Sequence, residues 1–145
     1  MLQAQWSFRR VLHTFHALLL GFPIALFSAA LITDITYLNT AHIQWTNFSS
    51  WLIAGALVGG GGVIVCALLA LLLDWRRTSR RFHLVYIAVA VVMWIIGLIN
   101  AFQHSRDAWS SVGTEGLLMS IVTALLAVLA GVMLFSRSSA WEFDR

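Results

Sequence analysis

Long apolar runs alternate with short polar segments along the whole chain. Each run carries at most one acidic or basic residue, and the runs cover about residues 12–38, 51–73, 82–102 and 117–135. A helix rises about 1.5 Å per residue, so roughly 20 residues cross the ~30 Å hydrocarbon core of a bilayer. The pattern predicts an all-α membrane protein, a single domain of four transmembrane helices in an up-down-up-down bundle. Residues 39–50 are expected to form a polar loop between the first two spans.

The arginines lie mainly on alternate connections, which predicts how the chain is oriented. The loops after the first and third spans hold only Arg106. The positive-inside rule therefore places both termini in the cytoplasm. The remaining basic residues lie near the N-terminus, between the second and third spans, and near the C-terminus: Arg9, Arg10, Arg76, Arg77, Arg80, Arg81, Arg137 and Arg145.

Composition excludes a soluble domain, because 60% of the residues are hydrophobic and only 10% are charged, against about 25% charged in soluble domains. The net charge of +3 comes from arginines at helix ends, so it indicates anionic lipid rather than nucleic acid as the partner. The expected head-group contacts are Arg76, Arg77, Arg80 and Arg81. The single Cys66 cannot form an intrachain disulfide and is expected to be a packing residue. The apolar run after Arg10 exceeds signal-peptide length, which predicts an uncleaved first span.

The first span carries a titratable residue near each end. His16 and Asp34 are 18 residues apart, which is five helical turns and about 27 Å, so they share a face at opposite membrane surfaces. Pro23 lies on the same face and frees the carbonyl of Leu19, which predicts a kink. Ionisable residues in such a position usually face a partner or a cavity rather than lipid.

Asp34 is expected to pair with a cation such as Arg106, to accept hydrogen bonds from hydroxyls such as Thr36 or Thr40, or to be protonated. Structural pairing is the favoured interpretation, with proton handling as the alternative. The residues grouped with Asp34 in this structural or proton-handling set are Pro23, Thr40, Asp74 and Arg106.

Three histidines lie toward the side of the termini. If the first and third spans run parallel across the bundle, His16 and His83 could face each other and hold a haem b, or contribute to a quinone site. His13 matches the depth of His83 more closely. The alternative is that these are interfacial histidines bonded to backbone carbonyls or lipid phosphates.

The second span contains small residues at helix-packing spacing. Gly55, Gly59 and Gly62 would let another helix approach closely. Packing within the bundle is the favoured interpretation, and a homodimer contact or room for a flat cofactor are the alternatives. Four consecutive glycines at 59–62 also predict a local irregularity of the helix.

Motifs of enzymes are missing from the sequence. It contains no zinc-ligand spacing, nucleophile elbow, phosphate loop or dinucleotide fingerprint, so no catalytic or metal-binding residue is predicted.

The first span contains a motif that reads His16, Phe22, Pro23, Asp34 and Thr40. This motif resembles that of a family of predicted four-span bacterial inner-membrane proteins catalogued as a domain of unknown function. The chain departs from the family pattern at Gly21, where the family has a second histidine, and at Ala17, where it has a proline. Some members are joined to Rieske domains or encoded near quinoprotein sugar dehydrogenases, which implies membrane electron transfer. The later part of the motif reads Trp51, Gly55, Asp74, Arg77, Arg81 and His83.

These observations leave three functional hypotheses. The leading one is a small membrane subunit associated with electron transfer, binding haem b or quinone through His16 and His83. The second is a non-catalytic anchor or assembly subunit whose glycine face docks a larger complex. The third is a proton-coupled carrier or channel that uses Asp34 and acts as a homo-oligomer.

Overall fold

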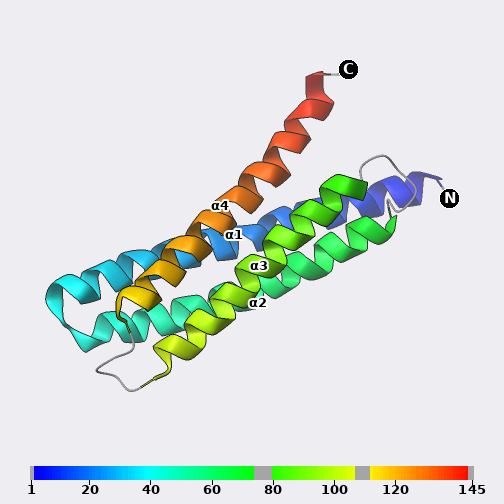
Figure 1. The fold of residues 1–145 in the computed structure, drawn as a ribbon. Coiled ribbons are helices and arrows are strands. Elements are labelled where there is room, and N and C mark those ends of the chain that lie inside the picture. The colour runs from blue at the N-terminus through cyan, green and yellow to red at the C-terminus, as the bar shows by residue number, and fades with distance from the viewer. Residues whose placement is uncertain (1, 74–79, 107–111, 144–145) are drawn as a thin grey trace.

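Four long helices make up the computed structural model, which describes residues 2–73, 80–106 and 112–143, with side chains over 8–73, 80–106 and 112–136. The helices are α1 (Leu2–Thr40), α2 (Ile43–Leu73), α3 (Arg80–His104) and α4 (Thr114–Phe143). Both termini lie at one end of the bundle, here called the terminal end, and the opposite end is the distal end (Figure 1). The all-α, four-helix prediction is confirmed. Asp74, Arg76 and Arg77 lie outside the described residues.

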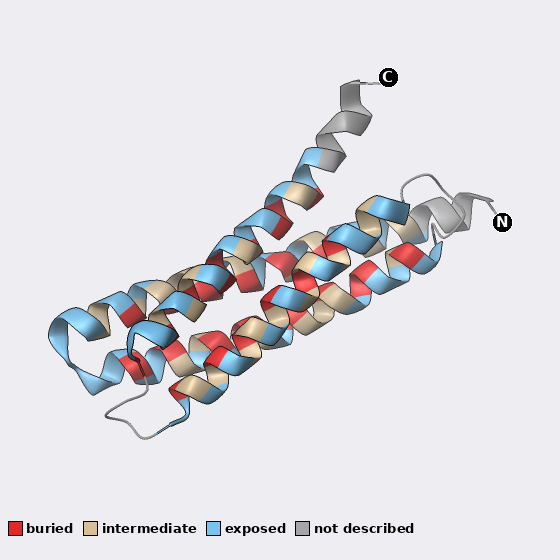
Figure 2. Cartoon of the chain, in the orientation of Figure 1, coloured by how far each residue is buried: buried red, intermediate tan, exposed pale blue. Residues whose placement is uncertain are grey.

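Within the described residues, four helical segments are long and apolar enough to cross a membrane: Phe8–Thr40, Ile43–Leu73, Arg80–His104 and Thr114–Ser136. Each contains the corresponding predicted span and extends past it on at least one side. Exposed positions recur along all four helices (Figure 2). Many of them carry large apolar side chains, for example Leu18, Val58 and Leu125. Such a surface suits a hydrocarbon solvent, because burying it against lipid replaces its contact with water.

The connection between α1 and α2 is much shorter than predicted. Residues 39–50 were expected to form a loop, but only residues 41 and 42 lie outside the helices. The polar side chains of this region bond to carbonyls of their own helix: Ser50 Oγ donates to Thr46 O and Thr40 Oγ1 to Thr36 O. Because their hydrogen bonds are satisfied locally, these residues did not end the helices. Ala41 makes the turn with a φ of 55°, in the left-handed region.

Each helix packs against two neighbours, so α1 and α3 face each other diagonally across the core. Buried positions on both helices recur at alternating intervals of four and three residues, the 3.5-residue period of a bundle. The two sets differ by a constant offset of 70 in residue number. On α1 they are His16, Leu20, Pro23, Phe27, Ala30 and Asp34, and on α3 they are Tyr86, Ala90, Met93, Gly97, Asn100 and His104.

Large and small residues alternate across this diagonal. A Cβ placed on Gly97 would lie 2.7 Å from Phe27 Cζ, so the ring of α1 occupies the space that the glycine of α3 leaves. Leu20 and Ala90, at the same offset, belong to one buried apolar cluster. The parallel, diagonal arrangement of the first and third spans is therefore confirmed.

The glycine face of α2 packs onto α1. A Cβ on Gly59 would lie 2.6 Å from Phe22 Cβ, one on Gly55 3.0 Å from Leu26, and one on Gly62 2.9 Å from Leu19. This is the packing within the bundle that the sequence favoured. Residues 59–62 are helical without a positive φ, so the expected irregularity was wrong. The helix α1 is continuous through Pro23, and the kink expected there stays a prediction.

Candidate functional site

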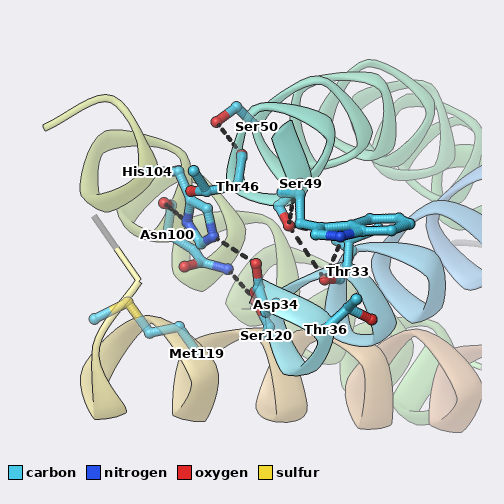
Figure 3. A network of polar contacts seen from close by, with 12 residues as sticks. Thr33, Asp34, Thr36, Thr46, Ser49, Ser50, Asn100, His104, Met119 and Ser120 are labelled. Carbon is cyan, nitrogen blue, oxygen red and sulfur yellow. Dashed lines mark hydrogen bonds and ion pairs between the residues drawn. The ribbon is translucent and has the colours of Figure 1, made fainter. Parts of the chain in front are cut away.

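The distal half of the core contains a polar cluster around Asp34, whose side chain is 0% exposed. His104 Nε2 on α3 lies 2.9 Å from Asp34 Oδ1, and Ser120 on α4 donates to Asp34 Oδ2 over 2.5 Å. Asn100 Nδ2 donates to Ser120 Oγ over 2.8 Å. These four residues, called the distal polar site, connect three helices (Figure 3).

The hydrogen-bond partners of His104 indicate where its ring hydrogens lie. Its Nδ1 lies 2.9 Å from the backbone oxygen of Asn100, which only accepts, so Nδ1 carries a hydrogen. One further proton then lies between His104 Nε2 and Asp34 Oδ1. The pair is either an imidazolium with a carboxylate or a neutral imidazole with a carboxylic acid. The geometry therefore accommodates one proton between the imidazole of His104 and the carboxyl group of Asp34.

The hydrogen bonds from Asn100 to Ser120 and from Ser120 to Asp34 both donate toward the carboxyl group of Asp34. The amide nitrogen of Asn100 can only donate, so Ser120 Oγ must accept from it, and the single hydroxyl hydrogen of Ser120 is free to point at Asp34. The carboxylate is thereby met on one oxygen by an imidazole and on the other by a hydroxyl. Such an arrangement stabilises negative charge inside a protein.

A second hydrogen-bonded layer adjoins the distal polar site on the side of α2. Thr33 Oγ1 and Ser49 Oγ are 2.7 Å apart, and Ser49 also reaches the carbonyl of Ala30. The hydroxyls thus tie α1 to α2, and all four helices contribute polar side chains to the distal half of the bundle (Figure 3).

The terminal half of the core contains a second diagonal contact between α1 and α3. His16 Nε2 and Tyr86 OH are 2.9 Å apart, and the two rings meet edge-on with centroids 5.3 Å apart. Both side chains are buried. This contact, called the terminal polar pair, lies 18 residues from Asp34 and His104 on both helices, about 27 Å along the axis.

His16 thus bonds Tyr86, and its expected juxtaposition with His83 stays a prediction. The constant offset of 70 brings residue 86 opposite residue 16 and leaves His83 nearly one turn closer to the terminal end. His13 is exposed. The described residues contain no group of three or more histidine, cysteine or acidic side chains placed to hold a metal ion.

A family model described as a predicted membrane protein (DUF2231) matches residues 12–135, a range that includes both polar sites. The chain belongs to the DUF2231 family. No curated protein and no solved structure matches it. The resemblance drawn from the sequence is thus confirmed at the level of the family, whereas the Rieske and quinoprotein associations stay predictions.

The partners that the sequence suggested for Asp34 in this DUF2231 protein were wrong. Thr36 and Thr40 donate to carbonyls of their own helix, and Arg106 is exposed. Both oxygens of Asp34 are instead bonded to His104 and Ser120. A hydroxyl donor was among the alternatives that the sequence suggested, and Ser120 fills that role.

Sequence reasoning missed four residues of the DUF2231 sites. For three of them the signal was present as a second stripe with the 18-residue spacing of the first span, running from Tyr86 to His104 on α3, whereas Ser120 lies on α4. The residues missed are Tyr86, Asn100, His104 and Ser120.

The outward-facing Arg80 and Arg81 lie at the terminal end, and their contact with lipid head groups stays a prediction.

Proposed function

We propose that this protein is a small membrane subunit that binds and releases a proton at the distal polar site. One observation carries the proposal: a carboxyl group buried among membrane-spanning helices shares a proton with an imidazole, Asp34 with His104. Ionisable groups are expensive inside a membrane, and those that are retained commonly belong to proton or ion pathways.

The proton is expected to exchange with the distal side alone. Between the two polar sites the described core is mainly apolar, with Leu20, Phe27, Ala90 and Met93 buried on the α1–α3 diagonal. One bundle therefore offers no continuous polar path along this diagonal. A proton-coupled carrier or channel, the third hypothesis from the sequence, would have to place its path between the copies of an oligomer.

Infrared spectroscopy of the full-length protein in liposomes tests the proposal. In the difference between acidic and alkaline samples, the carbonyl band of a protonated buried carboxyl group is expected. Asp34→Asn should remove this band, and His104→Gln should shift it. The matched control is Glu115→Gln, which changes an exposed acid near the same end and should leave the band in place. An identical difference spectrum for the wild type and Asp34→Asn would contradict the proposal.

An electron-transfer role with a cofactor at the terminal polar pair is the second candidate. The buried hydrogen bond between His16 and Tyr86 favours a quinone over haem b, because a quinone carbonyl accepts hydrogen bonds from such side chains. Ligation of haem iron by His16 and His83 would require His16 Nε2 to leave Tyr86. A Soret band of the purified protein that is lost in His16→Ala would support haem. Co-purified quinone that is lost in Tyr86→Phe would support a quinone.

An anchor or assembly subunit would have to dock its partner through a surface other than the glycine face of α2, which the sequence suggested. The glycine face of α2 is covered by α1 at Leu19, Phe22 and Leu26, so it does not face a partner. A larger complex or a homo-oligomer would dock on the lipid-facing side chains instead. The bacterial inner membrane and cytoplasmic termini are part of the proposal, supported by the distribution of the arginines.

A further inference from the structure

The amide of Asn100 is hydrogen-bonded at only one of its two ends. The side chain is 0% exposed, and its nitrogen donates to Ser120 Oγ. Its oxygen, Oδ1, is buried and receives no hydrogen bond from any residue that the structure describes. Buried side-chain oxygens in folded proteins nearly always have a donor, from the protein or from an ordered water.

Rotating the amide by half a turn does not remove this problem. Oδ1 would then face Ser120 Oγ, and the single hydroxyl hydrogen of Ser120 would have to choose between Asn100 and Asp34. The amide nitrogen would lose its acceptor at the same time. The observed orientation is therefore the one that suits Asp34, and it leaves Oδ1 without a donor among the residues that the structure describes.

Asn100 lies near the distal end of α3. It is four residues, about 6 Å along the axis, from His104, where α3 ends. Its oxygen points away from Ser120 and toward the distal end, the same end toward which the Met119 side chain extends (Figure 3).

We infer that a water molecule binds at Asn100 Oδ1. The water donates to Asn100 Oδ1, Asn100 Nδ2 donates to Ser120 Oγ, and Ser120 donates to Asp34 Oδ2. This one-way chain fixes the direction of the donors around the carboxyl group. The inference of the water site itself comes from the buried amide of Asn100. Only the link between this hydrogen-bonded chain and proton binding rests on the proposed function.

Hydroxyl-radical footprinting of the full-length protein in liposomes tests the inference, because radiolysis of a bound water oxidises side chains beside it. Met119 and Met133 both lie half-buried on α4 and form a matched pair. Met133 packs against an apolar cluster in the terminal half. Mass spectrometry should show Met119 oxidised severalfold faster than Met133. Equal rates in the wild type would overturn the inference.

Two variants separate the bound water from general exposure of Met119. Asn100→Leu removes the acceptor and should lower the oxidation of Met119 to the rate of Met133. Ser120→Ala keeps the amide oxygen and should preserve the faster rate. Unchanged Met119 oxidation in a folded Asn100→Leu variant would overturn the inference. A positive infrared test of Asp34 with equal methionine rates would remove the water and leave the proposed function standing.

Discussion

At the scale of single residues, the chemistry of this protein depends on which side chain faces Asp34. The sequence predicts that Asp34 pairs with a cation, accepts hydrogen bonds from hydroxyls or is protonated, because an isolated charge is costly inside a membrane. It did not identify them, since the partners come from α3 and α4, 70 and 86 residues away. The identity of a partner on another helix depends on the register between helices, which no pattern within one helix reveals.

Removing both members of the buried pair should cost less than the costs of the two single removals added together. Asp34→Ala or His104→Ala leaves the other group without its partner, and each is expected to lower the free energy of unfolding by about 2–4 kcal/mol. The double variant should lose less than the sum of the two, because no orphaned group remains. Unfolding in mixed micelles measures all three, and strict additivity would contradict the pairing.

The terminal polar pair is expected to contribute less than the distal one. Tyr86→Phe removes only the hydroxyl that meets His16 and should cost about 0.5–1.5 kcal/mol of unfolding free energy. The same unfolding assay measures this loss, and Tyr37→Phe, at a half-buried tyrosine, serves as the control. If Tyr86→Phe lowered the free energy of unfolding as much as Asp34→Ala does, the terminal polar pair would contribute as much as the distal polar site, contrary to this prediction.

At the scale of elements, the apolar runs were sufficient to find all four helices, because length and hydrophobicity decide whether a segment spans a bilayer. Their ends were less predictable. The segment after α1 is rich in hydroxyl and amide side chains, yet it is almost entirely helical, since those side chains bond to the backbone one turn earlier. At the terminal end, a side chain of another helix bonds to the end of α2. Arg9 Nη2 on α1 donates to the carbonyl of Leu73, the last residue of α2.

The close approach of α1 and α2 depends on the absence of a side chain at Gly59. Gly59→Ala would place a Cβ 2.6 Å from Phe22 Cβ, which can move only with its backbone. We expect a loss of about 1–3 kcal/mol in unfolding free energy. The control is Gly21→Ala, because nothing lies within 4 Å of its Cβ. That variant should gain up to about 1 kcal/mol from helix propensity, and equal effects of the two would contradict the packing.

The two-residue connection after α1 stores a small strain. Ala41 adopts a φ of 55°, a region that suits glycine, while its N–H donates to Tyr37 O as a helix-ending bond. Ala41→Gly is therefore expected to stabilise the protein by about 0.5–1 kcal/mol. Thermal unfolding in detergent measures this, with Ala54→Gly, in the lipid-facing surface of α2, as a control that should destabilise.

At the scale of the whole molecule, the bundle places both termini on one side of the membrane. With Cys66 replaced by alanine, single cysteines near each terminus should react with an impermeant maleimide from the same side of intact cells or inverted vesicles. A cysteine at the exposed His42 should react from the other side. Reaction of the two termini from different sides would contradict the arrangement, and the side on which they react decides whether they are cytoplasmic.

The constant offset between α1 and α3 has a mechanical consequence. Both diagonal hydrogen-bonded contacts, His16 with Tyr86 and Asp34 with His104, join residues at the same displacement. A slide of one helix past the other by a single residue, about 1.5 Å, would stretch both at once. Shear along this diagonal is therefore resisted at two depths of the bilayer.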